Sequence, residues 1–209
     1  IRNNTKCGIY VWGNYSKIFG NDIMYSGDYG LKMDNSSHNC VFWNDFISNN
    51  LDFTNRTSQA YDNRSTNCWN CSVANPWGIG YKYGGKAYDN YTGNYWSNCT
   101  VNDPDGDGIN NSAYSIDGGA GAQDYRPLIA PWNNYTLVKC GDVNGDGRVR
   151  MSDYTKLLWY VSEIPGTTLA SKWAGDVTGD GKIRMSDYTK LLWYVSEIPG
   201  TNLNCKSCC

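Results

Sequence analysis

An internal repeat constrains the fold of this chain more than any other feature. The 18 residues RMSDYTKLLWYVSEIPGT occupy 150–167 and recur unchanged at 184–201, an offset of 34 residues. Each copy follows an acidic, glycine-punctuated loop, GDVNGDG from Gly141 and GDVTGDG from Gly175. A duplicated unit of this kind is typical of repeat architectures, in which the copies share one structure and one kind of site.

The polar residues of both loops have the spacing of an EF-hand calcium site. Counted from Asp142, oxygen-bearing side chains fall at positions one, three, five and twelve, position six is glycine, and position seven offers its backbone carbonyl. The second loop repeats this order from Asp176. The predicted ligands are Asp142, Asn144, Asp146, Arg148 (through its carbonyl) and Asp153 in the first loop, and Asp176, Thr178, Asp180, Lys182 (through its carbonyl) and Asp187 in the second.

These ligand types favour Ca²⁺ over zinc or copper, because the loops offer hard oxygen atoms and contain neither His nor Cys. A single loop of this kind is also compatible with a metal-free, Asx-rich turn. Two loops in register, each followed by an apolar segment, favour calcium instead. Thr178 departs from the pattern, since a hydroxyl or a bridging water must replace a carboxylate or amide oxygen. We therefore expect weaker binding in the second loop.

A helix is predicted after each loop. One face of the first is apolar at the i, i+3, i+4, i+7 spacing, formed by Tyr154, Leu157, Leu158 and Val161. Pro165-Gly166 ends this helix, and Pro199-Gly200 ends its copy. Trp159 and Trp193 lie largely off the apolar face. They either wrap around a very small core or are exposed aromatic residues, which are enriched at binding hot spots.

Residues 141–203 resemble a type I dockerin, with two calcium loops that end in Asp, two helices, and a linker at 168–174. Dockerins bind cohesin modules, so the resemblance implies a cohesin-like partner or neighbouring copies of this chain. It also implies the partner-facing residues Met151, Ser152, Leu158, Trp159, Met185, Ser186, Leu192 and Trp193. Bacterial dockerins often carry Lys-Arg where this chain has Leu-Trp, which indicates a more apolar partner face. Two nearly identical faces allow docking in either of two orientations.

Composition separates the C-terminal part from the rest of the chain. Residues 1–139 contain no Glu but 22 Asn, which predicts β-structure and loops. Asn-x-Ser/Thr sequons are frequent there and favour a secreted, N-glycosylated protein, although an Asn-rich chain also acquires sequons incidentally. They occur at Asn3, Asn14, Asn35, Asn55, Asn63, Asn70, Asn90, Asn98, Asn110 and Asn134. A net charge of −2 gives no reason to expect nucleic acid as a partner, and no apolar run is long enough to span a membrane.

The nine cysteines agree with an extracellular location, since no neighbouring His suggests zinc. Cys140 and Cys205 bracket the dockerin-like unit, whose ends should lie close together, so we predict a disulfide between them. An odd number leaves at least one thiol free or bonded to another chain. We expect such an intermolecular bond at Cys208-Cys209, with an internal bridge as the alternative.

Short apolar segments recur in the N-terminal part. IFGNDIMYSG from Ile18 aligns with VFWNDFISNN from Val41 at an offset of 23, and GIYV from Gly8 aligns with GLKM from Gly30 at an offset of 22. Strands that recur at this interval, with Gly and Asn between them, favour a parallel β-helix of stacked coils. A β-sandwich is the alternative.

The later motifs of this part, NCWN, GNYW, DPDGDG and DYRPL in that order, resemble the C-terminal end of NosD-like β-helix proteins, which are common at archaeal cell surfaces. The resemblance implies a mainly β fold for 1–133, the last coils and cap of a right-handed parallel β-helix. A linker at 134–140 and a small all-α dockerin-like domain at 141–209, with a Cys-rich tail, would follow. Asp103, Asp105 and Asp107 form a third calcium-like loop without a closing carboxylate, so a calcium site and an Asx-rich turn both stay open.

Three classes of function are compatible with these features. The favoured one is an extracellular structural or adhesive protein that its calcium-loaded module docks into a cell-surface, filamentous or sheath assembly. The second is a polysaccharide-binding β-helix, catalytic or not, attached to a cohesin scaffold. Glycosidase chemistry needs two carboxylates flanking one bond, and no such pair is recognisable, so we expect no enzyme activity. Copper handling, the third, is disfavoured because no His/Met/Cys cluster is present.

Overall fold

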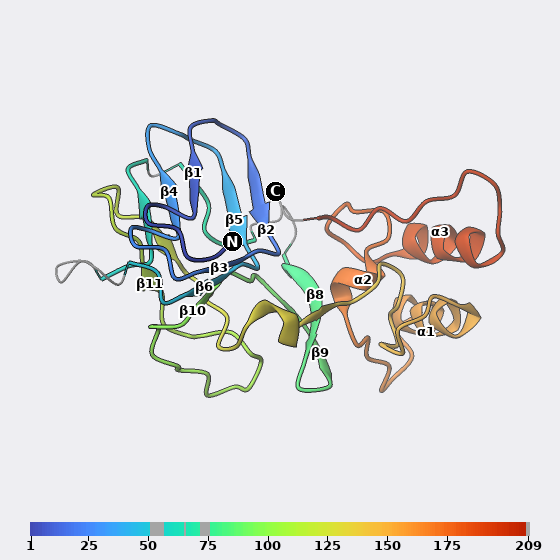
Figure 1. Ribbon diagram of the computed structural model, residues 1–209. Helices are drawn as coiled ribbons and strands as arrows, with labels where there is room; N and C mark the ends of the chain where they lie inside the picture. Colours follow the sequence, from blue (N-terminus) through green and yellow to red (C-terminus); the bar gives the residue numbers. More distant parts are fainter. Residues whose placement is uncertain (51–56, 65, 72–75, 208–209) are drawn as a thin grey trace. The chain divides into compact units, whose positions relative to one another are not determined.

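The computed structural model describes residues 1–50, 57–64, 66–71 and 76–207 (Figure 1). These residues form two compact units, one from 1–72 and 92–134 and the other from 73–91 and 135–208. The sequence indicated that a linker over 134–140 separates the two parts, whereas in the structure the segment around 76–91 belongs with the C-terminal part.

Short parallel strands build the first unit, and each successive coil of the chain contributes to the same sheets (Figure 1). The sheets are β1 (Ile9–Val11), β4 (Leu31–Met33) and β7 (Ala60–Asp62); β2 (Lys17–Phe19) and β5 (Cys40–Phe42); and β3 (Asp22–Met24), β6 (Asp45–Ile47) and β10 (Tyr95–Trp96). Ile9 pairs with Leu31 and Ile18 with Val41, which confirms the predicted offsets of 22 and 23. Parallel pairing between coils is not the pattern of an antiparallel β-sandwich.

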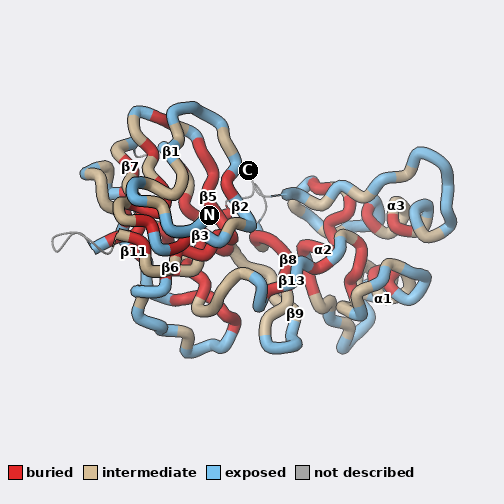
Figure 2. The backbone as a smooth tube through the Cα atoms, viewed as in Figure 1, coloured by how far each residue is buried: buried red, intermediate tan, exposed pale blue. Residues whose placement is uncertain are grey.

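The core of the first unit lies between these sheets, as the buried strand residues in Figure 2 show. Phe46 of β6 and Trp96 of β10 are at most 1 % exposed, and their rings stack with centroids 4.3 Å apart. The ring of Tyr114 also stacks on the ring of Trp96, with centroids 4.2 Å apart. It belongs to β11 (Tyr114–Ser115), which pairs antiparallel with β12 (Gln123–Asp124), and η1 (Trp132–Asn134) ends the unit.

A buried ladder of asparagine side chains runs through the coils. Nδ2 of Asn21 donates to Oδ1 of Asn44 (2.9 Å), and Nδ2 of Asn44 donates to Oδ1 of Asn94 (2.9 Å). The ladder ends at Asp124, which accepts from the backbone N–H of Asn94 (2.7 Å) and from Nε1 of Trp96 (2.9 Å). Some of the many Asn residues therefore belong to the core, where their amides form hydrogen bonds with one another and with the buried backbone.

The second unit combines a small sheet with three helices. Its elements are β8 (Ile79–Tyr83), β9 (Lys86–Asn90), β13 (Thr136–Leu137), α1 (Met151–Val161), α2 (Lys172–Gly175) and α3 (Met185–Val195). The antiparallel sheet has the order β13-β8-β9. The segment 134–140 was expected to be a linker, but part of it forms β13, and the linker expected at 168–174 contains the start of α2.

Two equivalent leucines hold the helices together. Leu157 of α1 and Leu191 of α3 are fully buried, and they share a core cluster with Val143 and Val177 of the preceding loops. This agrees with the apolar face predicted from the repeat. None of the helices in the described part of the chain is long and apolar enough to cross a membrane.

The β8–β9 hairpin is an insertion into the coils of the first unit. The backbone N–H of Cys71 donates to the carbonyl of Thr92 at 2.6 Å, so the segment between them leaves and re-enters the coil at one point. Residues within that segment, including Ile79–Asn90, belong to the second unit. The second unit is therefore assembled from two stretches of chain.

Candidate calcium and docking site

The first loop is organised around Asp142, whose side chain is fully buried. Its Oδ1 accepts hydrogen bonds from the backbone N–H groups of Gly145 (2.9 Å) and Asp146 (3.0 Å), and its Oδ2 accepts one from Gly147 (2.8 Å). Gly147 has a φ of 87°, which a residue with a Cβ adopts only at a cost. The loop therefore wraps closely around its first carboxylate.

Asp153 closes this loop from the first turn of α1. Its Oδ1 accepts from the N–H of Asn144 (3.1 Å) and its Oδ2 from the N–H of Arg150 (3.0 Å). A carboxylate at this place also favours the start of the helix, because it lies near the free N–H groups of the first turn. One side chain thus links the loop to the helix.

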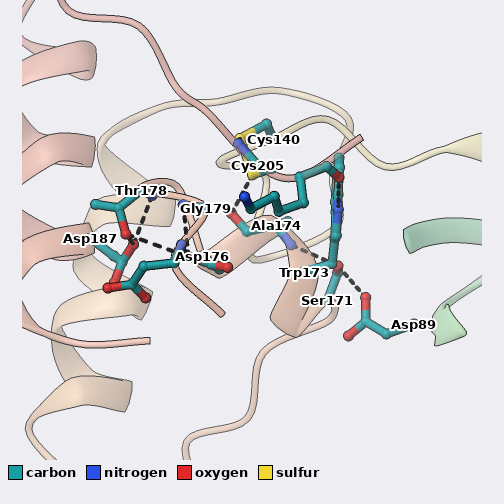
Figure 3. The surroundings of a disulfide bond; sticks show 12 residues. Asp89, Cys140, Ser171, Trp173, Ala174, Asp176, Thr178, Gly179, Asp187 and Cys205 are labelled. Carbon is teal, nitrogen blue, oxygen red and sulfur yellow. Dashed lines mark hydrogen bonds between the residues drawn. A yellow bond between two sulfur atoms is a disulfide. The ribbon is translucent and has the colours of Figure 1, made fainter. Parts of the chain in front are cut away.

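The second loop has the same geometry. Asp176 accepts from Gly179 (2.9 Å), Asp180 (3.0 Å) and Gly181 (2.9 Å). The closing Asp187 accepts from both the N–H (2.9 Å) and the hydroxyl (2.8 Å) of Thr178, as Figure 3 shows. The Thr178 hydroxyl occupies the place of the Asn144 side chain, and weaker calcium binding there stays a prediction.

The charge distribution of the first loop fits a divalent cation. Asp142 and Asp153 are both fully buried. Burial raises the pKa of Asp153, the N–H groups of Asn144 and Arg150 lower it, and the negative charges of Asp142 and Asp146 raise it again. Two carboxylates buried in one loop are unfavourable unless a cation compensates them. The oxygen donors match the ligands that Ca²⁺ prefers.

The fifth position of each loop is more exposed. Asp146 pairs with Arg150 at 2.7 Å, and Asp180 pairs with Arg184 at 3.0 Å. Arg150 also holds the pKa of Asp146 below its usual range through this hydrogen bond. Position seven, Arg148 or Lys182, follows two residues later and offers its backbone carbonyl. The predicted ligands of each loop thus come from one continuous segment.

The helices meet at a pair of equivalent tyrosines. Tyr154 of α1 and Tyr188 of α3 stack with ring centroids 4.7 Å apart, and their hydroxyl groups form a hydrogen bond. The side chains of Trp159 and Trp193 are 48 % and 49 % exposed. Of the two alternatives for these tryptophans, the structure supports exposed aromatic residues over completion of a small core.

The other predicted partner residues also lie at the surface of the helices. Met151 and Met185 are 51 % and 52 % exposed, Ser152 and Ser186 are exposed, and Leu158 and Leu192 are partly buried. Each exposed Trp lines a groove that runs to the turn after its helix. The first groove is lined by Asn144, Ser152, Thr155, Lys156, Trp159, Ile164, Pro165, Gly166, Thr167 and Thr168. The second has the residues at the corresponding positions, with Met185 and Asn204 in addition.

Sequence reasoning missed part of these grooves. Thr155, Lys156 and Ile164 were not among the predicted partner residues, although the structure places them beside Ser152 and Trp159. The signal that could have found them is the identity of the repeat itself, which extends beyond the helix into the IPGT turn.

The predicted disulfide between Cys140 and Cys205 is present, with Cα atoms 5.7 Å apart, and it joins the two ends of the dockerin-like segment (Figure 3). Cys40 and Cys71 each take part in a disulfide bond as well. Cys7 has a free thiol, and burial together with its hydrogen bond to Asp28 raises its pKa to about 11. Such a thiol contains little reactive thiolate at neutral pH. The expected bond at Cys208-Cys209 lies outside the described residues.

The third acidic loop is similar to the other two at its start. Asp103 accepts from the N–H groups of Gly106 (2.9 Å), Asp107 (3.2 Å) and Gly108 (3.0 Å). Within the described residues, the carboxylates of Asp103, Asp105 and Asp107 lie within 4.8 Å of one another. No carboxylate at position twelve closes this loop, so calcium there remains a prediction.

The sequons differ in their accessibility. Asn3, Asn14, Asn35, Asn98 and Asn134 are exposed, and Asn63, Asn70 and Asn90 are partly buried. Asn110 is only 1 % exposed, and its Nδ2 donates to the carbonyl of Thr100 at 2.7 Å. The predicted glycan at Asn110 is therefore incompatible with this fold, because its attachment atom is buried and bonded. Asn55 lies outside the described residues.

Two loops of this geometry, joined to two equivalent helices, form a tandem module whose acidic side chains have the spacing of EF-hand loops. Residues 140–196 match the family model of the dockerin type I domain, and residues 1–101 match that of the periplasmic copper-binding protein NosD. The chain thus carries a dockerin type I domain preceded by a NosD-like region. No curated protein and no solved structure matches it.

These matches define the general function of the C-terminal part. Dockerin type I domains bind calcium and typically bind cohesins, and the match therefore indicates a role in protein–protein docking for this part. Together with the NosD-like region, it indicates a secreted or cell-surface protein.

Proposed function

We propose that this chain is an extracellular structural or adhesive protein that its C-terminal module docks into a cell-surface, filamentous or sheath assembly. The first unit is the C-terminal end and cap of a right-handed parallel β-helix. The second unit holds calcium in the loops that begin at Asp142 and Asp176, and the Asp103 loop holds a third ion. Glycans occupy exposed sequons and keep the coils hydrophilic.

One observation carries the proposal: the exposed surface of the module is present twice. Trp159 and Trp193 are equally exposed, each beside an equivalent groove and an equivalent Ser and Lys. Exposed aromatic residues beside a groove are typical binding hot spots. A protein with two nearly identical docking faces can bind one partner in two orientations or connect two neighbours, and this suits an assembly component.

The positions of the acidic residues support a non-catalytic first unit. Asp62 and Asp124 are fully buried, and each accepts a hydrogen bond from a tryptophan indole, Trp69 and Trp96 respectively, at 2.9 Å. His38 stacks on Tyr15 with centroids 5.0 Å apart. Glycoside hydrolysis requires two carboxylates that flank the scissile bond. Asp62 and Asp124 instead have structural roles, because they are buried and bonded to tryptophans.

Sedimentation of the purified chain, with Ca²⁺ and with EGTA, tests the proposal. We expect calcium-dependent self-association, or calcium-dependent binding of a purified cohesin module, and loss of both in the Trp159→Ala/Trp193→Ala variant. A chain that neither associates with itself nor binds cohesin in Ca²⁺ contradicts the docking role. Polysaccharide cleavage that a single Asp substitution abolishes contradicts the non-catalytic role.

A further inference from the structure

The β8–β9 hairpin lies outside the segment that matches the dockerin family, yet it belongs to the same compact unit. It packs on α2, the short helix that leads into the second calcium loop, while α1 and α3 pack on each other (Figure 1). Ala87 of the hairpin and Val138 beside β13 contribute to the core cluster that contains Leu157 and Leu191. The hairpin is thus built into the core of the module.

Asp89 of β9 holds the start of α2. Its Oδ1 accepts from the hydroxyl of Ser171, and its Oδ2 from the N–H of Lys172, each at 2.5 Å (Figure 3 shows the first contact). Ser171 is fully buried and is the N-cap of α2, where its Oγ accepts from the N–H of Ala174 at 3.0 Å. A cap fixes the first turn of a helix, so Asp89 fixes α2 through Ser171.

The second calcium loop begins where α2 ends. Asp176 is the C-cap residue of α2, and its N–H donates to the carbonyl groups of Lys172 (3.2 Å) and Trp173 (3.3 Å). The first ligand of the second loop is therefore positioned by a helix of four residues. So short a helix depends on tertiary contacts for its stability, and Asp89 supplies one of them.

Lys82 of β8 reaches the first calcium loop. Its Nζ donates to the carbonyl of Gly145 at 2.6 Å. Gly145 is the fourth residue of that loop, and its N–H is bonded to Oδ1 of Asp142 at 2.9 Å. The same hairpin therefore contacts elements next to the first ligand of both loops.

The hairpin and α2 approach too closely for a side chain between them. A Cβ added to Gly80 of β8 would lie 2.6 Å from Oγ of Ser171 and 3.0 Å from the ring of Trp173. The carbonyl of Gly80 accepts from the N–H of Val138 at 2.9 Å, which also fixes this strand to the C-terminal stretch. The methyl group of a Gly80→Ala variant would therefore displace Ser171, which allows the contact to be tested.

We propose that the hairpin supports calcium binding in both loops. Asp89 is a positioning residue for the second loop, and Lys82 is one for the first. The proposal rests on the assignment of calcium to both loops. It implies that calcium affinity depends on a segment inserted far upstream, between two coils of the other unit.

Site-resolved calcium titration of the full-length chain tests this. In ¹⁵N-labelled protein, the amides of Gly147 and Gly181 report on the first and second loops, because each donates to the first carboxylate of its own loop. Supporting groups next to metal ligands typically change metal affinity by about 10- to 100-fold. Asp89→Ala should weaken calcium binding at Gly181 by about 10-fold and leave Gly147 unchanged. Asp89→Asn, which retains an acceptor oxygen, should have a smaller effect.

Lys82→Met should weaken calcium binding at Gly147 by about 10-fold and leave Gly181 unchanged. Removal of a positive charge near a calcium loop would by itself strengthen binding, so weaker binding identifies the lost hydrogen bond as the cause. Lys86→Met is the matched control, since Lys86 is exposed at the turn end of the same hairpin. It should bind calcium like the wild type at both loops.

Gly80→Ala should weaken the second site as Asp89→Ala does, because the new methyl group displaces Ser171. Gly13→Ala is its control, since a Cβ at Gly13 meets nothing within 4 Å. Equal calcium affinities in Asp89→Ala, Lys82→Met, Gly80→Ala and the wild type overturn the inference and leave the proposed function intact. A wild-type chain whose Gly147 and Gly181 do not respond to calcium overturns the calcium assignment itself. If Asp89→Ala does not fold, the Gly181 response of Asp89→Asn decides the question.

Discussion

The disulfide between Cys140 and Cys205 should decide whether the docking module stays folded without calcium. The bond closes a segment with a sequence separation of 65 residues. By the loop-entropy relation, a closed loop of this length stabilises the native state by about 4 kcal/mol at 25 °C. That is a large part of the ~5–15 kcal/mol by which whole domains are stable. The Cys140→Ser/Cys205→Ser variant should lose this contribution.

Calcium should restore the stability that the variant lacks. A ligand that binds only the native state adds about 4 kcal/mol when its concentration is a thousand times Kd, so a saturated module compensates for the missing bond. Hydrogen exchange measured by mass spectrometry on peptides from α1 and α3 reports the stability of this unit alone. In EGTA, the variant should exchange these amides about 10²- to 10³-fold faster than the wild type. Ca²⁺ should slow exchange in both proteins by a similar factor, so the variant in Ca²⁺ should exchange about as slowly as the wild type in EGTA.

Equal exchange of the variant and the wild type in EGTA would refute the reasoning, because it would mean that the bond does not limit opening of the module. Cys7→Ser is the control, since Cys7 has a free thiol in the other unit. It should leave exchange in α1 and α3 unchanged.

Three further predictions follow from individual side chains. Leu157→Ala should destabilise the second unit by about 2–5 kcal/mol, whereas Trp159→Ala/Trp193→Ala should cost little stability and lose partner binding, as urea unfolding and sedimentation can show. Thr178→Asn should strengthen calcium binding at the second loop, measured by the Gly181 amide during titration. Burial raises the pKa of Asp124 to about 7, so the folded first unit binds this proton more tightly than the unfolded chain does. Its stability to urea should therefore fall as pH rises from about 4 to 7, and a rise over that window contradicts the burial argument.

Much of the fold could be predicted from the sequence because the chain repeats itself. The offsets of 22 and 23 fix which residues pair in parallel, and Ile9–Leu31 and Ile18–Val41 pair as expected. The tandem loops likewise specify their own geometry, since Asp142 and Asp176 accept the same three backbone N–H groups. The repeat offsets and the loop motifs can be read directly from the sequence, so these features could be predicted without knowledge of distant contacts.

The features that the sequence did not reveal depend on distant contacts. The contact between Asp89 and Ser171 joins residues 82 positions apart, and nothing near either residue indicates the other. The asparagine ladder was also missed, because Asn44 and Asn94 are buried by stacking across coils and not by any local pattern. The same limit explains the error at Asn110, whose sequon is intact but whose amide is buried.

The number of calcium ions bound per chain tests the central claim most directly. Equilibrium dialysis or calorimetric titration should show two more bound calcium ions in the wild type than in the Asp142→Ala/Asp176→Ala variant, whatever the Asp103 loop binds. An equal number in both proteins would show that the tandem loops are not calcium sites, and it would contradict the account of this chain as a calcium-dependent docking protein.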